Sequence, residues 1–305
     1  MPLESELRPP RDDDFDAILA LLNAHQLAAF GEASETAEDL RTWLTSPSVE
    51  LDRDIRLLEQ EGRLVGYADV DPNGAEPSVW WCDVKVDPNV DAGGALGVLV
   101  GWLEERAQEG VLRIWTAAQD DRVVHAFERL GFATVRHSYR MEIELGGPRR
   151  EPSWPTGIST RTVTPDDGRL VYDLVLEVWQ DTWDPMDETF EEWQHWTTGA
   201  PAYDPTLWFL AGDGNEVAGF SLCREDPNDP RAGHVATLGV RRPWRRQGLG
   251  EALLQHSFRE FERRGYSRAT LGVDAASPTG ATRLYERAGM TMYRDTVYLE
   301  RPVRV

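Results

Sequence analysis

The two halves of this chain repeat one another. The sequence HAFERLGF at residues 125–132 is echoed by RLYERAGM at residues 283–290, which lie 158 residues further along. Each half also shows the same order of predicted elements: a strand and a helix, two strands around a turn, a strand ending in valine, a long helix, a strand, a short helix and closing strands. A repeat of this length indicates duplicated domains, because solenoid repeats have a period of about 20 to 50 residues.

A segment rich in glycine and proline separates the halves. It has neither a helical nor an alternating period, which is typical of a linker. We therefore predict a first domain at residues 1–147, a linker at residues 148–157 and a second domain at residues 158–305. The mixture of strands and helices in each half predicts an α/β fold of the α+β kind, with a mostly antiparallel sheet flanked by helices.

Charge and hydropathy limit the functions that this chain can have. A net charge of −21 repels nucleic acids and anionic membranes. No apolar run reaches the roughly 18 residues needed to span a bilayer, and the polar, acidic beginning does not resemble a secretory signal. We expect a cytoplasmic protein without nucleic-acid or membrane partners. The two cysteines, Cys82 and Cys223, are too far apart in sequence for a metal knuckle, so we expect buried thiols and no metal site.

The segment from residue 234 to residue 265 carries the most specific motif. HVATLGV at residues 234–240 is a predicted strand, and VRRPWRRQGLG at residues 240–250 is a loop rich in arginine. A helix follows, with apolar side chains at helical spacing and Gly265 as its predicted end.

A strand that leads through a loop into a helix forms a natural anion site. The first helical turn leaves its N–H groups unpaired and carries the positive end of the helix dipole. Arg245 and Arg246 supply charged hydrogen-bond donors, and Gly248 and Gly250 let a phosphate approach the backbone. The amides suited to a diphosphate belong to Gln247, Gly248, Leu249, Gly250 and Glu251. An ordinary turn with surface arginines is the alternative. The motif lacks the Gly-Lys-Ser/Thr of a Walker loop and the third glycine of a Rossmann loop.

These motifs together resemble those of the GCN5-related N-acetyltransferase (GNAT) family. The similarity rests on residues 240–250, on Leu284 and Tyr285, and on Gly289, and it covers residues 158–305 in element order. The tandem layout resembles that of mycothiol synthase and related two-domain acetyltransferases. The resemblance implies acetyl-CoA as cofactor. It also implies a splayed sheet in each domain, in which the strand ending at Val240 separates from the strand at residues 268–275.

The resemblance also assigns residues to the cofactor. Leu238, Gly239 and Val240 would hold the pantetheine arm and the acetyl carbonyl through their backbone. Ser277 stands where the family often has an asparagine that contacts the cofactor. Tyr285 matches the tyrosine that lies near the departing sulfur in the family.

Transfer to an amine requires an acid and a base. A phenol with a pKa of about 10 can protonate a thiolate whose conjugate acid has a pKa of about 8.5, so Tyr285 is the predicted acid. Family members often use a glutamate early in the preceding strand as base. This chain has His234 there, a titratable group with an ordinary pKa of about 6.5. A capping or surface histidine is the alternative interpretation.

The first half aligns with the second but lacks its chemistry. Asp91 falls at the position of Arg245, Leu96 at that of Gly250, and Phe127 at that of Tyr285. A carboxylate repels a diphosphate, a leucine obstructs it, and phenylalanine has no proton to donate. We expect the first domain to be non-catalytic.

Three functions fit the sequence. The first is an acetyl-CoA-dependent N-acetyltransferase that acetylates a primary amine of a small molecule by direct attack. The second is a protein or peptide N-acetyltransferase, and the third is a non-catalytic acyl-CoA-binding module. The joint presence of Tyr285, Arg245, Gly248 and Gly250 favours an enzyme, since a scaffold needs none of them.

Overall fold

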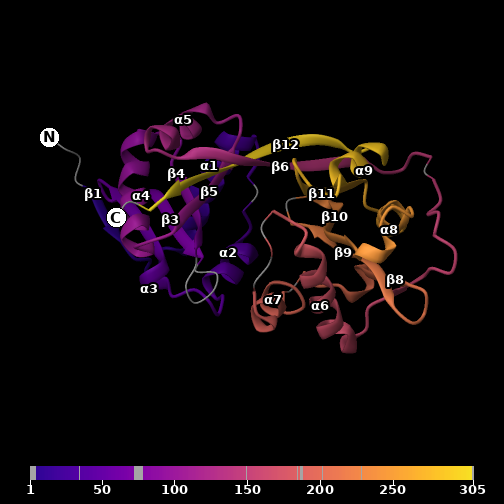
Figure 1. The fold of residues 1–305 in the computed structure, drawn as a ribbon. Coiled ribbons are helices and arrows are strands. Elements are labelled where there is room, and N and C mark those ends of the chain that lie inside the picture. The colour runs from indigo at the N-terminus through magenta and orange to yellow at the C-terminus, as the bar shows by residue number, and fades with distance from the viewer. Residues whose placement is uncertain are drawn as a thin grey trace. The chain divides into compact units, whose positions relative to one another are not determined.

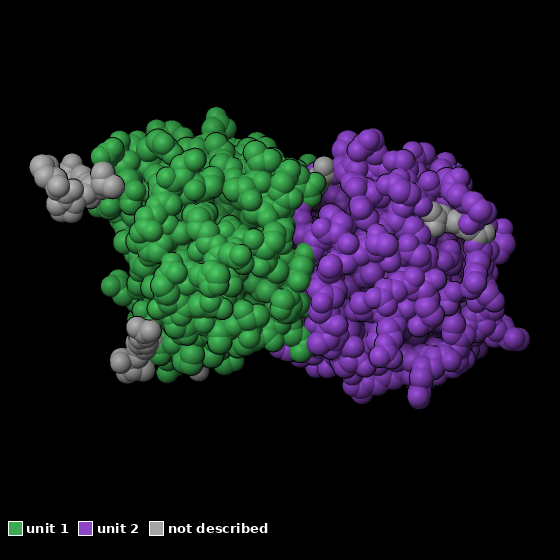
Figure 2. Space-filling model, turned by 90° about the horizontal axis from the view of Figure 1, so that it is seen from above, with its two compact units in different colours: residues 1–137, 295–305 green, residues 138–294 purple. Residues whose placement is uncertain are grey.

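The chain folds into two compact units of mixed helix and strand (Figures 1 and 2). The computed structural model describes residues 5–303 except 34, 72–77, 149, 184, 186, 187, 201 and 228. Unit 1 contains residues 1–137 and 295–305, and unit 2 contains residues 138–294.

Unit 1 is a mostly antiparallel sheet with helices on both faces. Its strands lie in the order β1-β2-β3-β4-β5-β12, and among the described residues only the β4–β5 pair is parallel. Its elements are β1 (Ser5–Arg8), α1 (Phe15–Phe30), α2 (Ala37–Leu44), α3 (Leu51–Asp54), β2 (Ile55–Gln60), β3 (Arg63–Asp71), β4 (Val79–Val86), α4 (Ala92–Ala107), β5 (Val111–Ala117), α5 (Asp121–Arg129) and the first residues of β6 (Ala133–Glu144).

Unit 2 has the same architecture. Its strand order is β6-β11-β10-β9-β8-β7, and β10–β11 is the only parallel pair in the part of this unit that the structure describes. Its elements are β7 (Ser159–Thr162), α6 (Gly168–Trp179), α7 (Phe190–Trp196), β8 (Trp208–Gly212), β9 (Val217–Asp226), β10 (Asp229–Val240), α8 (Leu249–Arg264), β11 (Arg268–Asp274), α9 (Ala281–Arg287) and the first residues of β12 (Thr291–Pro302), with short 3₁₀ turns at Pro165–Asp167, Pro205–Leu207 and Arg242–Trp244. The mixed, mostly antiparallel fold predicted from the sequence is confirmed.

The closing strands of the two halves are exchanged between the units. Residues 138–144 of β6 belong to unit 2, where they pair with β11. Residues 295–302 of β12 belong to unit 1, where they pair with β5. The bounds of the units therefore differ from the domains predicted at residues 1–147 and 158–305, because each unit is completed by a strand from the other half of the sequence.

The parallel strands in each unit separate along their length. In unit 2, β10 pairs with β11 only from residue 232 to residue 235, and its later residues continue alongside β9. In unit 1, β4 pairs with β5 from residue 79 to residue 82. The splayed sheet implied by the family resemblance is thus present in both units.

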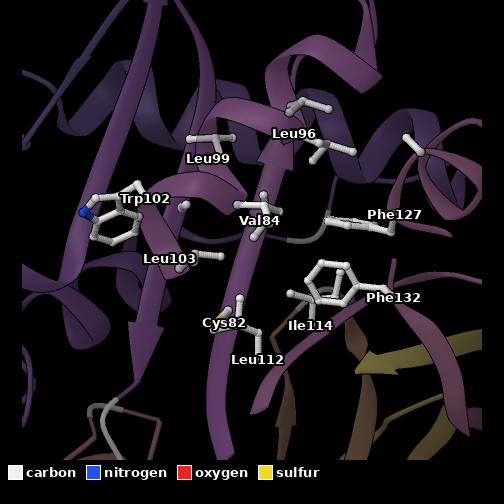
Figure 3. Close-up of a cluster of buried hydrophobic side chains, with 14 of the residues drawn as sticks. Cys82, Val84, Leu96, Leu99, Trp102, Leu103, Leu112, Ile114, Phe127 and Phe132 are labelled. Carbon is white, nitrogen blue, oxygen red and sulfur yellow. The ribbon is translucent and has the colours of Figure 1, made fainter. Parts of the chain in front are cut away.

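Alternation along the strands builds a core on each face of each sheet. On β8, Trp208 and Leu210 pack toward α6 and α7, whereas Phe209 packs toward α8. In unit 1, α4 and α5 cover one face, and Figure 3 shows Leu99 of α4 and Phe127 of α5 around the strands there. Helices α1 and α2 cover the opposite face.

Gly233 on β10 tests how tightly unit 2 is packed. A Cβ there would lie 2.3 Å from Cδ1 of Phe261, which is fully buried. We expect Gly233→Ala to lower the free energy of unfolding by about 1–3 kcal/mol through overpacking, measured by urea denaturation. The matched control is Gly272→Ala on the neighbouring strand β11, where an added Cβ meets nothing within 4 Å. Equal effects of the two substitutions would contradict the packing of Phe261 against β10.

Candidate functional site

A cavity of about 880 Å³ lies in unit 2, where β10 ends and α8 begins. Its walls come from the end of β10, the loop that follows, the first turn of α8, and the segment from residue 278 to residue 287, with Asp181 at its rim. The predicted site residues that line it are Leu238, Val240, Arg245, Arg246, Gly248, Leu249, Gly250, Glu251 and Tyr285. The structure therefore brings the loop, the helix and the tyrosine to one place.

The N-terminus of α8 carries no side-chain cap. Gly248 precedes the helix with φ of 86°, a left-handed conformation that favours glycine. Gly250 lies in the first turn, where an added Cβ would make only ordinary contacts with Leu284 and Val240. The first N–H groups of the helix and the positive end of its dipole therefore remain available to an anion.

Arginines on the loop flank this helix end. The Arg245 guanidinium donates from Nε to the Val240 carbonyl at 2.9 Å and pairs through Nη2 with Asp181 Oδ2 at 2.6 Å. Arg242 also donates to Asp181, with Nε 3.1 Å from Oδ1. Hydrogen bonds from Arg242 and Arg245 lower the pKa of the Asp181 carboxyl to about 2. Arg246 lines the cavity with φ of 59°, a left-handed conformation that is uncommon outside glycine.

Asp181 is a site residue that the sequence analysis missed. It follows α6 and lies 64 residues before Arg245, so no local spacing connects the two. The only indication in the sequence was general: exposed arginines need counter-charges, so some carboxylate was to be expected near the arginine loop. In the structure this carboxylate competes with any bound phosphate for the same guanidinium groups.

Tyr285 lies on α9 and also lines the cavity. Its side chain is buried, and burial raises the pKa of its phenol to about 12. The hydroxyl therefore keeps its proton at neutral pH and has no hydrogen-bond partner among the described residues. A buried, protonated phenol that faces a cavity is suited to donate a proton or a hydrogen bond.

Comparison with known proteins identifies the family. The model of the acetyltransferase (GNAT) family matches residues 170–290. A mycothiol acetyltransferase from Streptomyces bingchenggensis is 31% identical over 253 residues, which cover 79% of this chain and 78% of that protein. The chain belongs to the GNAT acetyltransferase family. It is therefore an N-acetyltransferase that uses an acyl-CoA, as the sequence motifs predicted.

Other comparisons extend the match to the whole chain. A mycothiol acetyltransferase from Streptomyces coelicolor is 29% identical over 305 residues and covers 96% of this chain and 93% of that protein. The crystal structure of a GCN5-related N-acetyltransferase from Sphaerobacter thermophilus has a TM-score of 0.80 and 33% identity, and covers 99% of this chain and 96% of that one. A tandem GNAT protein from the clavulanic acid biosynthesis pathway, 18% identical with a TM-score of 0.78, covers 99% of both chains and shares the fold.

His234, the predicted base of this GNAT chain, lies in the core of unit 2. Its Nδ1 is 2.8 Å from Thr270 Oγ1 and its Nε2 is 3.3 Å from Arg140 Nη1. The Thr270 hydroxyl in turn donates to Asp226. Because Arg140 can only donate, Nε2 must accept and Nδ1 carries the proton. Both nitrogens of His234 are thus engaged away from the cavity, and its catalytic role stays a prediction without geometric support.

Three other predicted residues lie beside the cavity lining. Packing requires a glycine at position 239, because a Cβ there would be 2.4 Å from Cζ of Phe220. The Gln247 side chain donates to the Pro243 carbonyl at 3.1 Å. The Ser277 hydroxyl is 3.0 Å from Thr279 Oγ1, and it is Thr279 that lines the cavity. Their cofactor contacts stay predictions.

The corresponding helix end in unit 1 is filled by the chain itself. Asp91 caps α4, and its Oδ2 accepts a hydrogen bond of 2.9 Å from the Gly94 amide. Leu96 and Phe127, at the positions of Gly250 and Tyr285, are fully buried. The anion-binding capacity that α8 keeps is therefore satisfied internally at α4.

The described part of the chain contains no group of three His, Cys, Asp or Glu residues that could hold a metal ion. None of its helices is both long enough and apolar enough to cross a membrane. Cys82 and Cys223 are buried free thiols.

The environment of His234 makes its titration testable. Burial lowers the pKa of His234 well below 6.5, and the charges of Arg140 and Arg224 add to the effect. The ring should therefore stay neutral as the pH falls through 6.5, the ordinary pKa of histidine. The unfolded chain takes up this proton below its ordinary pKa, so His234 lowers stability as the pH falls below about 6.5. NMR of the ring Cε1–H signal, assigned by its loss in His234→Asn, measures this. An inflection near pH 6.5 would contradict the buried network.

Proposed function

We propose that unit 2 binds acetyl-CoA in the cavity between α8 and α9 and transfers the acetyl group to the primary amine of a small molecule. The observation that carries this proposal is the uncapped N-terminus of α8, which lines the same cavity as Tyr285, a residue whose raised pKa keeps its hydroxyl protonated. A thioester supplies an activated acyl group. The residues of the chain supply binding, orientation and a proton.

The diphosphate would lie on the first turn of α8. The amides of residues 247–251 are at the positive end of the helix dipole, and Arg245 and Arg246 add charged donors. The fit is supported by the glycines at 248 and 250, since neither is required by contact with a neighbouring side chain. Asp181 must release Arg245 and Arg242 to a ligand that needs them.

The pantetheine arm would lie along the end of β10. Beyond residue 235 this strand is paired with β9 on one side and has separated from β11 on the other. The backbone groups of Leu238 and Val240 on the open side can pair with the amides of an extended ligand, as an added strand would. This supports the assignment of residues 238–240 to the arm.

Tyr285 would act as the acid at the departing sulfur. Its pKa of about 12 keeps the hydroxyl protonated, and a phenol donates a hydrogen bond to a thiolate at little cost once water is excluded. Its place in the lining of the same cavity as Leu238 and Val240 supports the role.

The acceptor is proposed from the relatives and from charge. Several relatives are named mycothiol acetyltransferases, which supports a small molecule rather than a protein as acceptor. The net charge of −21 attracts a cationic amine. We also propose a cytoplasmic location, which rests on the composition of the chain.

We also propose that the first repeat does not transfer acyl groups. Asp91 fills the end of α4 that would receive a diphosphate, and Phe127 has no proton to give. This proposal compares the N-terminus of α4 with that of α8, and Phe127 with Tyr285. It therefore does not depend on which strands complete each compact unit.

Calorimetry with acetyl-CoA tests the binding site. We expect one site per chain and a loss of about ten- to a hundredfold in affinity for Arg245→Gln, because a charged hydrogen bond contributes about 1.5–3 kcal/mol. The matched control is Arg263→Gln, near the far end of the same helix, where the guanidinium pairs with Glu260. Asp181→Asn should have the opposite sign and strengthen binding about threefold, less so at high salt. Two sites per chain, or wild-type affinity in Arg245→Gln, would refute this assignment.

Tyr285→Phe tests the acid. We expect kcat to fall by about a hundredfold or more, with the affinity for acetyl-CoA within about twofold of wild type, because the ring and its packing are kept. Thiol release with a panel of small primary amines measures kcat. Tyr266→Phe is the control, since that hydroxyl bonds to Glu225 and does not line the cavity. Unchanged turnover in Tyr285→Phe would remove Tyr285 from the mechanism, and turnover of peptides alone would replace the acceptor class.

A further inference from the structure

Unit 1 has a cavity of its own, of about 230 Å³. It lies on the face of the sheet that α1 and α2 cover, next to the point where β4 and β5 stop pairing. Its walls combine aromatic rings with carboxyl groups, and none of its lining residues belongs to the proposed acyl-CoA site.

The carboxyl groups are placed where they weaken the fold. Asp69 on β3 lies directly opposite Asp83 on β4, and the Asp83 amide donates to Asp69 Oδ1 at 3.2 Å. Like charges directly opposite in a sheet destabilise it. Asp69 is 7% exposed, and burial together with the charge of Asp83 raises its pKa well above the ordinary value. A fold that needed only packing here would have no use for this pair.

Hydrogen bonds hold these groups in fixed positions. The Tyr67 hydroxyl donates to Asp69 Oδ2 at 2.6 Å, and the indole N–H of Trp43 on α2 donates to Tyr67 at 3.1 Å. Glu35 is fixed through its backbone, because Asn23 on α1 both donates to its carbonyl and accepts from its amide at 3.0 Å. The wall is therefore built from α1, α2, β3 and β4 rather than from a surface cluster.

One cation of the chain already uses this chemistry. Lys85, the only lysine, is 2% exposed, pairs with Asp83, and holds its ammonium 3.5 Å from the centre of the Trp115 ring. An ammonium between a carboxylate and an aromatic face is a cation–π arrangement. Lys85 is a single positive charge among several acids of the lining, and it already pairs with Asp83. The raised pKa values of Asp69 and Glu35 keep protons on these two carboxyl groups, and a second cation would favour their release.

We propose that this cavity binds a small organic cation with an ammonium group, held by Asp83 and Glu35 and by the rings that include Trp81 and Trp115. An anion would meet the same carboxylates and be repelled. A metal ion is disfavoured, because no group of residues in the described chain has the arrangement to ligate one. The aromatic lining favours a cation with apolar substituents over a hydrated inorganic ion. The proposal goes beyond the acyl-CoA site and does not depend on it.

Cation binding should be linked to proton release. Burial, followed by the charge of Asp83, raises the pKa of Glu35 to about 7. The other charged groups that face Glu35 are Lys85 on β4 and Asp39 on α2, and Asp69 on β3 lines the same cavity. A bound cation favours the ionised carboxylate, so affinity should rise from about pH 6 to about pH 8 as Glu35 loses its proton.

The test uses the full chain and calorimetry with choline and with butylammonium. Each is compared with its uncharged isostere, 3,3-dimethyl-1-butanol or 1-butanol. We expect saturable binding of the cations at one site and none of the alcohols. Asp83→Asn and Trp115→Leu should each weaken binding about tenfold or more, while Glu105→Gln, an exposed site on α4 that removes the same charge, should leave it unchanged. Thermal melts establish that each variant is folded, and Glu35→Gln replaces Asp83→Asn if that variant unfolds.

Titration of acetyl-CoA into the same variants separates this proposal from the function of unit 2. Wild-type affinity for acetyl-CoA together with lost cation binding supports two independent sites. Choline has no N–H to exchange for an acetyl group, so its binding reports the cavity alone. Butylammonium that is converted to an amide in the presence of acetyl-CoA is an acceptor as well, whereas butylammonium that is bound but unconverted is a ligand of unit 1. Equal binding of cations and alcohols, or wild-type binding by folded Asp83→Asn and Trp115→Leu, overturns the proposal.

Discussion

The exchange of closing strands is the constraint on which both units depend. In unit 1, the strand that pairs with β5 is formed by residues 295–302, which come after the whole second repeat in the sequence. Leu299 of this segment is fully buried in the core. In unit 2, β11 lies between β10 and residues 138–144, which end the first repeat. Contacts such as Arg113 with Glu300 join residues 187 apart. Neither repeat contains all the strands of one unit, so the two repeats must fold together as one chain. Pairing between strands so distant in the sequence is slow.

This constraint gives the first repeat a structural role in unit 2 that does not depend on whether it transfers acyl groups. The strand β11 must be held on both edges for β10 to separate from it at a fixed point, and one of those edges is supplied by the first repeat. The separation exposes the end of β10, and the chain then turns into α8. The open helix end and the open strand edge of unit 2 thus rest on pairing that the second repeat alone does not provide.

The two units show how one topology supports different chemistry. In both, a strand leads through a loop into a helix of 16 residues, α4 or α8. At α4 a carboxylate satisfies the helix amides, and at α8 a left-handed glycine leaves them unsatisfied. The same divergence recurs on the opposite face of the sheet. Unit 1 gathers Asp69, Asp83 and Trp115 there around one lysine, which is a site for positive rather than negative charge.

The sequence predicted the structural features that depend on neighbouring residues. It did not predict those that depend on residues distant in the sequence. The helix from Leu249 to Arg264 and the glycine that ends it follow from periodicity, whereas the placement of Tyr285 in the cavity followed from the family resemblance. The strand exchange did not follow, because alternation shows which face of a strand is buried and not which strand lies beside it. His234 looked available for catalysis because burial depends on the neighbours that β9, β11 and β6 supply.

Asp181 holds the arginines of the site in place before an anion binds. A chain with a net charge of −21 repels a polyanionic ligand at a distance, so the attraction must be local. Arginines at the loop supply it, and without a counter-charge they would repel one another. Asp181 bridges Arg242 and Arg245 and keeps both at the rim of the cavity. Arg242 is exposed, and exposed ion pairs contribute only about 0–1 kcal/mol. A diphosphate that also gains the amides of α8 can therefore displace the carboxylate, so the bridge orders the arginines for an anion at only a small cost in affinity.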